Sequence, residues 1–170
     1  MKIRREEEKD YKEIDKVVEE AFNSAEHADG NEKDLVIALR NGISYIPELA
    51  LVAEENGKII GHVMFTKAEV GDETVLALAP ISVLPDAQRK KVGSALIKEA
   101  HKIARELGYN YSVVLGSEKY YPKFGYKKAI EFGITSPFDV PEKNFMAIKL
   151  TDDANKIKGK MKYAKEFGIE

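Results

Sequence analysis

The sequence predicts a single α/β domain in which a mixed, twisted sheet of about six or seven strands carries helices on both faces. Its 170 residues suit one compact domain with its own core. Apolar runs of strand length alternate along the chain with amphipathic helical segments. One of these helices lies between two apolar strands, which is the order of a parallel β–α–β unit.

The N-terminal quarter of the chain predicts one short strand and two helices. Residues 1–5 are short enough for an edge strand. From Tyr11 to Phe22 the apolar residues recur at helical spacing, so a first helix is expected there. A polar loop follows, and a short second helix around Leu35 ends near Asn41.

A β-hairpin is expected in the next segment. Leu49–Ala53 and Ile59–Thr66 are apolar runs separated by a turn that contains Asn56 and Gly57. An Asn-Gly pair tolerates the positive φ angles that a tight hairpin turn needs. The two runs therefore pair as antiparallel strands.

The third long strand, Thr74–Leu84, contains a proline at position 80. Because proline has no N–H to donate to a neighbouring strand, we expect a bulge or an interruption at Pro80. Pro85 ends the strand, and an amphipathic helix follows and stops at Gly108. The apolar stripe of this helix comprises Val92, Leu96, Ala100, Ile103 and Leu107. His101 falls on its polar flank and is expected to be solvated.

The remainder of the chain predicts a strand at Tyr111–Leu115, with Tyr111 packing at its start, and a helical turn near Tyr120. Further strands are expected at Tyr126–Ile134 and Phe145–Leu150, and a final one at Lys160–Tyr163.

Composition narrows the function classes. Lys and Arg number 27 and Asp and Glu number 29, so the formal charge of −2 favours neither nucleic acid nor an anionic membrane as a partner. The absence of cysteine excludes disulfides and thiol nucleophiles. The three histidines have no metal-ligand spacing, so no metal is expected.

The N-terminus lacks the apolar core of a signal peptide, and no uncharged stretch reaches the roughly 20 residues of a membrane span. A cytoplasmic protein is expected.

The most informative segment is the strand end, basic loop and helix start at residues 80–97. Gln88, Arg89, Lys90 and Lys91 crowd the first turn of the helix, and Gly93 leaves one approach free of a side chain. The unpaired N–H groups and partial positive charge of a helix N-terminus attract phosphate. The segment therefore fits a pyrophosphate site, although a solvated basic loop remains an alternative.

This segment resembles motif A of the GNAT superfamily of N-acyltransferases, in which Gln or Arg is followed by two residues, Gly, one residue, and Gly or Ala. Gln88, Lys91 and Gly93 occupy those positions, so Lys91 stands where the family usually has its first glycine. If the position requires a positive φ, lysine costs about 1–2 kcal/mol. If the position is helical, the main-chain N–H of Lys91 can still bind phosphate, and its ammonium group adds attraction for phosphate.

A second resemblance lies in the segment YYPKFGY, residues 120–126, which is similar to motif B of the same family. Tyr121 lies four residues before Gly125, where many relatives place the tyrosine that protonates the departing thiolate. Tyr120 competes for this role, and packing of an aromatic pair is the alternative to catalysis. The closing segment GKMKYAKEF also resembles the YhbS-like branch of the family.

The resemblance implies a sheet that splays between its fourth and fifth strands. Residues 1–150 would form the acyltransferase domain, and residues 151–170 an extension packed on it. Acetyl-CoA would be the co-substrate, with its pantetheine arm beside the bulged strand and its pyrophosphate at the helix start. The resemblance assigns it the residues Ile81, Ser82, Val83, Gln88, Arg89, Lys90, Lys91, Val92, Gly93 and Ser94.

The function expected from the resemblance is direct transfer of an acetyl group to a primary amine, carried by a small molecule or a peptide. Tyr121 would be the general acid. The general base stays open among Glu26, His27, Glu54 and His62. Two alternatives are a non-catalytic acyl-CoA-binding regulatory module and an unrelated nucleotide-phosphate-binding protein. A homodimer is compatible with the size of the chain.

Overall fold

The computed structural model describes residues 1–23 and 31–168, and these ranges contain three α-helices and nine strands of one mixed sheet. Seven strands lie in the order β1-β2-β3-β4-β5-β8-β6, while β9 pairs with β3 and β7 pairs with β9. The α-helices are α1 (Tyr11–Asn23), α2 (Glu32–Arg40) and α3 (Val92–Glu106). The strands are β1 (Lys2–Arg5), β2 (Tyr45–Glu55), β3 (Lys58–Val70), β4 (Glu73–Val83), β5 (Tyr111–Leu115), β6 (Lys127–Lys128), β7 (Ile134–Thr135), β8 (Phe145–Lys149) and β9 (Gly159–Lys162).

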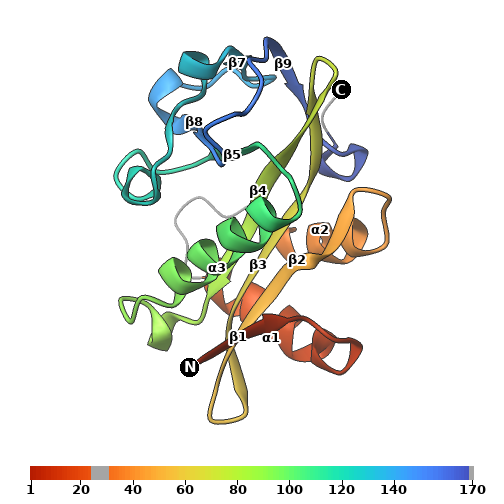
Figure 1. Cartoon of the computed structure of the whole chain (residues 1–170). Helices are drawn as coiled ribbons and strands as arrows, with labels where there is room; N and C mark the ends of the chain where they lie inside the picture. Colours follow the sequence, from red (N-terminus) through yellow and green to blue (C-terminus); the bar gives the residue numbers. More distant parts are fainter. Residues whose placement is uncertain (24–30, 169–170) are drawn as a thin grey trace.

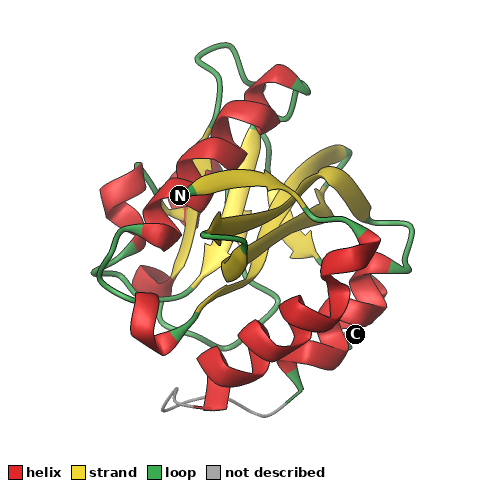
Figure 2. Ribbon diagram, turned by 90° about the horizontal axis from the view of Figure 1, so that it is seen from below, coloured by secondary structure: helices red, strands yellow, loops and turns green. Residues whose placement is uncertain are grey.

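Helices cover both faces of the sheet, as expected (Figure 2). Consecutive residues of β3 show the two faces. A Cβ placed on Gly61 would lie 2.8 Å from Cγ1 of Val92, so this position faces α3. The next residue, His62, contacts Glu6, which also binds Arg40 of α2. The glycine therefore lets α3 approach one face closely, while α2 packs toward the other.

The predicted hairpin is confirmed as β2 and β3, which pair antiparallel. Its turn residues Asn56 and Gly57 have φ angles of 53° and 78°, the left-handed values that the Asn-Gly pair predicted. Both strands extend beyond the predicted apolar runs, because β2 begins at Tyr45 and β3 continues to Val70.

The predicted irregularity at Pro80 is a bulge in β4. Val63 of β3 pairs with Ile81, but Phe65 pairs with Leu78, so β4 carries one extra residue in the interval that contains the proline. The parallel pairing of β4 with β5 is confined to Leu76 and Ala77. Beyond Ala77 the two strands separate, which confirms the predicted splay (Figure 1).

The predicted buried face of α3 was partly wrong. Leu107 is 42% exposed, whereas His101, expected to be solvated, is only 4% exposed. Nε2 of His101 lies 2.9 Å from the Tyr126 hydroxyl, which lies 2.7 Å from Oγ of Ser112 in β5. The helix is turned so that His101 faces the sheet, where this hydrogen bond satisfies its polar ring.

The single strand predicted over Tyr126–Ile134 was also wrong. The segment contains the two-residue strand β6, a 3₁₀ turn η4 (Ala129–Phe132) and the strand β7. Ala129 is fully buried at the start of the turn, and Gly133 ends it with a φ of 82°. A left-handed glycine at this position breaks the extended conformation that the apolar residues predicted. The other 3₁₀ turns are η1 (Glu8–Asp10), η2 (Pro85–Ala87), η3 (Tyr121–Phe124), η5 (Glu142–Asn144) and η6 (Lys165–Phe167).

A buried charge cluster joins the N-terminal elements on the α2 side of the sheet. The carboxylate of Glu6 accepts hydrogen bonds from Nε of Arg40 at 2.7 Å, from Nη2 of Arg40 at 2.9 Å and from the Tyr45 hydroxyl at 2.7 Å. Nε2 of His62 lies 2.9 Å from the same carboxylate. Burial alone would raise the pKa of Glu6, but the hydrogen bonds from Arg40, His62 and Tyr45 outweigh it and lower the pKa from 4.5 to about 2.

The lowered pKa of Glu6 predicts a specific loss of stability in acid. Its contribution to the free energy of unfolding is complete above pH 4.5 and disappears as the pH falls toward 2. We expect Glu6→Gln to cost about 3 kcal/mol at pH 7, and this difference to shrink by about 2 kcal/mol at pH 3. Urea unfolding at both pH values measures it, with the exposed Glu8→Gln as the control. Equal differences at both pH values would contradict the assignment.

Candidate active site

The connection from β4 to α3 leaves the first main-chain N–H groups of the helix without a partner within it. Arg89 and Lys91 have φ angles of 69° and 63°, both left-handed, and Lys91 caps α3 without a side-chain hydrogen bond. Ala95 is the first residue of the helix whose N–H is bonded within it, to the carbonyl of Lys91. The N–H groups before it have no partner within the helix. Left-handed residues beside a helix start form a concave anion site.

Lys91 therefore adopts the positive-φ conformation, the first of the two that the sequence left open. At a φ of 63° the side chain is strained where the family usually has glycine. The backbone nevertheless adopts the turn that the motif requires.

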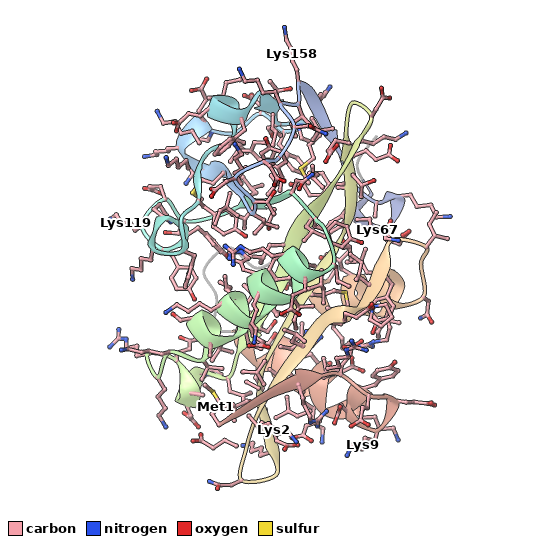
Figure 3. The ribbon with its side chains drawn as sticks, viewed as in Figure 1. Met1, Lys2, Lys9, Lys67, Lys119 and Lys158 are labelled. Atoms are coloured by element: carbon pink, nitrogen blue, oxygen red, sulfur yellow. The ribbon has the colours of Figure 1, made fainter. Side chains whose placement is uncertain are left out.

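A pocket of about 410 Å³ opens over this helix start. Its basic side chains are Arg89, Lys91 and Lys123, of which the last comes from η3. The other residues that line it are Val83, Ala87, Gln88, Val92, Gly93, Ser94 and Tyr120. Not every lysine of this region contributes, because Lys119 points outward from its loop (Figure 3). The pocket combines exposed main-chain N–H groups with three cations, as a site for a phosphate ester requires.

A second pocket of about 230 Å³ continues the first around the edge of β4. The two share Val83, Gln88, Gly93 and Tyr120. The second pocket adds Ile81 of β4 and Ala21 and Phe22 of α1. Since it is lined by both α1 and α3, this groove passes the edge of β4 where β5 has already separated from it.

The edge of β4 that faces the groove carries unpaired main-chain groups. The N–H of Leu84 donates to the carbonyl of Ile60, and Ser82 pairs with His62 two residues earlier. Because hydrogen bonding alternates along an antiparallel ladder, the main-chain groups of Ile81 and Val83 point away from β3. The side chain of Gln88 donates to the carbonyl of Val83 at 3.4 Å, consistent with that direction.

Tyr120 stands at the junction of the two pockets. A Cβ placed on Gly93 would lie 2.6 Å from its hydroxyl, so the glycine is required for the tyrosine to occupy this place. Burial raises the pKa of Tyr120, and a hydrogen bond with the Ser94 side chain opposes the rise. The approach that Gly93 was expected to leave open is thus occupied by a phenol.

Tyr121, the predicted general acid, is 9% exposed and lines neither pocket. Its ring makes edge contacts with Tyr120 and Tyr126, with ring centroids 5.1 and 5.8 Å apart. A Cβ on Gly116 would lie 2.5 Å from Cε2 of Tyr121, so this glycine makes room for the ring. Burial, and to a lesser extent Tyr120, raises the pKa of Tyr121 to about 12.

Most of the predicted cofactor residues meet in these pockets. All of them line one pocket or the other except Ser82 and Lys90. The side chain of Ser82 is 2% exposed, on the opposite face of β4 from the pocket lining. Sequence reasoning missed Lys123, although it lies inside YYPKFGY, and it missed Ala21 and Phe22, which no local signal connects to residues sixty positions away.

The four candidates for the general base differ in position. Glu26 and His27 lie outside the described residues. Glu54 binds Nη2 of Arg4 at 3.0 Å and lines neither pocket. His62 is fully buried against Glu6, next to Ser82 on the neighbouring strand.

Another open pocket, of about 340 Å³, lies toward the other end of β4, where it is lined by Thr74 together with residues of β3, β9 and η6. It contains none of the motif residues, so the candidate active site is the groove at the β4–α3 end. No group of three or more His, Asp or Glu side chains within residues 1–23 and 31–168 could hold a metal ion. None of the described helices is both long and apolar enough to cross a bilayer.

Known proteins resemble this chain in sequence and in fold. Residues 8–126 match the Acetyltransferase (GNAT) family. Over 118 residues the chain is 36% identical to the uncharacterized N-acetyltransferase YjhQ of Escherichia coli K12, a stretch that covers 66% of this chain and 65% of that protein.

Two crystal structures are similar over nearly the whole chain and confirm the expected fold. The GNAT family N-acetyltransferase YhbS of Escherichia coli, in complex with CoA, has a TM-score of 0.88 and 28% identity, covering 98% of this chain and 91% of that one. A GNAT family acetyltransferase of Brucella melitensis, in complex with acetyl-CoA, has a TM-score of 0.81 and 30% identity, covering 98% and 97%. The chain belongs to the GNAT family of acetyltransferases.

Proposed function

We propose that this protein moves an acetyl group from acetyl-CoA to a primary amine in a single ternary complex. The observation that carries the proposal is the groove along the edge of β4 that β5 leaves open, which runs from a cationic helix start to a strand edge without a strand partner. One end suits a diphosphate and the other an extended amide-containing chain. Acetyl-CoA has both parts, and the two GNAT relatives are bound to CoA and acetyl-CoA.

Binding would divide between the two ends of the groove. The pyrophosphate would accept hydrogen bonds from the first N–H groups of α3, with Arg89, Lys91 and Lys123 supplying charge. The pantetheine amides would pair with the main-chain groups of Ile81 and Val83 that point away from β3, as an added strand pairs with an exposed sheet edge.

The strand edge also offers a donor for the thioester carbonyl. The N–H of Ser82 is directed toward His62 in the ladder, while that of Val83 faces the groove. We therefore assign Val83 the hydrogen bond to the thioester oxygen, where it would stabilise developing negative charge. Alignment of the amine against this carbonyl would supply much of the acceleration.

Tyr121 would protonate the departing thiolate. A phenol with a pKa of about 12 remains protonated at neutral pH and can donate to the sulfur. The chain has no cysteine to form a thioester of its own, which favours direct attack by the amine. The acceptor would enter where Ala21 and Phe22 line the second pocket.

Calorimetry with acetyl-CoA tests the binding site. We expect the double variant Arg89→Glu and Lys123→Glu to bind at least about tenfold more weakly, with a loss that diminishes as salt rises. The control is Lys98→Glu with Lys102→Glu, two exposed positions of α3 outside both pockets. No heat of binding from the unaltered protein would remove the proposal.

The strain at Lys91 makes a separate prediction. Lys91→Gly relieves the left-handed lysine and is expected to raise the free energy of unfolding by about 1 kcal/mol, whereas Lys91→Ala keeps the strain and does not. Both variants lose the ammonium and should bind acetyl-CoA more weakly by a similar factor. Thermal or urea unfolding, followed by calorimetry, measures the two effects. A Lys91→Gly protein no more stable than Lys91→Ala would contradict the cost of the strain.

Substitution of each tyrosine distinguishes their roles. We expect Tyr121→Phe to lower kcat by about a hundredfold and leave acetyl-CoA affinity within about twofold, because only proton donation is lost. Tyr120→Phe should keep most of the activity. CoA release over a library of amines measures both. Equal activity of Tyr121→Phe and the unaltered protein would refute its role, and acetyl-CoA binding without release for every amine would favour a regulatory binding module.

A further inference from the structure

The buried cluster around Glu6 determines which ring nitrogen of His62 carries a proton. Glu6 is fixed as a carboxylate by two hydrogen bonds from Arg40 and one from Tyr45, and a carboxylate can only accept. Nε2 of His62, 2.9 Å from Glu6, must therefore carry the proton of that hydrogen bond. In the neutral ring this leaves Nδ1 as an unprotonated acceptor.

That acceptor has no partner among the described residues. Nδ1 of His62 is one of the few buried polar side-chain atoms there without a hydrogen bond, and Oγ of Ser82 is another. The exposed fractions of the two residues are 0% and 2%. Ser82 is the direct cross-strand partner of His62, and such partners project side by side from the same face of a sheet.

The pair lies directly behind the groove. Ser82 sits between Ile81 and Val83, which both line the second pocket together with Ala21 and Phe22 of α1. Its side chain points to the face of the sheet opposite Gly61 and α3. This is the end of the groove where the acceptor amine is proposed to enter.

We propose that His62 accepts, through the hydroxyl of Ser82 and one water molecule, the proton that the acceptor amine must lose. The inference rests on the proposed acetyltransferase function and supplies the base that the sequence left open. Glu6 and Arg40 are positioning residues in this relay. Glu6 holds Nε2 of the ring, which leaves Nδ1 without a partner on the face of the sheet that His62 shares with Ser82, and it stabilises the imidazolium that forms, as a buried carboxylate does for a histidine base.

The protons balance across one turnover. An ammonium acceptor must lose two protons to become an amide nitrogen. The first passes along the water and the Ser82 hydroxyl, each of which gives up one proton as it takes another, to Nδ1 of His62, leaving a neutral amine. The nitrogen lone pair then forms the C–N bond and the C–S bond breaks. The second proton reaches the thiolate through Tyr121, and the imidazolium afterwards returns its proton to solvent.

The charged and titratable surroundings of His62 come from several elements. Glu6 follows β1, Arg40 belongs to α2 and Tyr45 to β2, while the Arg40 guanidinium lies 3.8 Å above the ring centroid of Tyr11 in α1. Strand β4 contributes only the neutral Ser82. The positive charge of Arg40 balances the negative charge of Glu6. The imidazole of His62 can therefore hydrogen-bond to a carboxylate without a net negative charge beside it.

Kinetics of Ser82 variants test the relay. We expect Ser82→Ala to lower kcat about a hundredfold with the KM for acetyl-CoA unchanged, and Ser82→Thr, which keeps the hydroxyl, to restore most of the rate. The rate of Ser82→Ala should rise with pH until the amine itself is neutral, because that variant has no relay to remove the first proton.

A matched control is available on the same strand as His62. Thr66 is fully buried and its hydroxyl also lacks a partner, but it pairs with Ala77, away from the groove. Thr66→Val should leave kcat and the pH profile unchanged. A Ser82→Ala protein with the activity and pH profile of Thr66→Val would overturn the relay.

Nitrogen NMR of labelled histidine tests the same geometry without turnover. His62, assigned by the loss of its signals in His62→Gln, should carry its proton on Nε2 and have a bare Nδ1 whose shift moves in Ser82→Ala but not in Thr66→Val. A proton on Nδ1 at neutral pH would refute the relay. Absence of CoA release from the unaltered protein with every amine would instead refute the proposed function, so the two failures are distinct.

Discussion

The site depends on one constraint, which is that β4 and β5 share only two residue pairs before they part. A strand that stayed paired along its length would have its main-chain groups satisfied and would leave no gap for a ligand. The bulge at Pro80 changes the register of β4 on its other side, against β3, at the start of the separated segment. The open edge, the groove and the placement of the helix start at its end all follow from this separation.

Two buried polar networks flank the gap. On the α2 side, Glu6 ties Arg40, Tyr45 and His62 together and so joins β3 to the elements that cover it. On the α3 side, His101 and Ser112 bind the same Tyr126 hydroxyl and connect α3 to β5. Burial and, to a lesser extent, Arg105 lower the pKa of His101 to about 4, so this second link stays neutral near pH 7. Apolar packing alone would fix the two sides less specifically, because hydrogen bonds impose direction.

Local signals predicted much of the fold. The Asn56-Gly57 turn and the bulge at Pro80 each follow from the backbone requirements of a single residue type, and the start of α3 follows from the apolar stripe that begins at Val92. It was harder to predict which face of α3 is buried, because His101 is polar and its partner Tyr126 lies 25 residues away. The strand predicted after Tyr126 was wrong because Gly133 turns the chain where apolar content favoured extension.

The candidate site also has a part that the sequence predicted and a part that it did not. Its phosphate end is contiguous in sequence, so the motif was sufficient to find Gln88, Arg89 and Gly93. The cluster of Glu6, Arg40 and His62 is assembled from residues separated by 34 and 56 positions, and no periodicity connects them. Their contact depends on how β1, α2 and β3 pack, which only the folded chain reveals.

The open edge of β4 has a further consequence for the protein when its groove is empty. An unsatisfied strand edge is a template for pairing with other chains, and proteins usually protect such edges by covering or charging them. Here the exposed length is short and recessed between α1 and α3, so an incoming polypeptide strand would meet helices on either side. The recess proposed for the thioester arm would thereby also keep other chains from pairing with this edge of β4 in the empty protein.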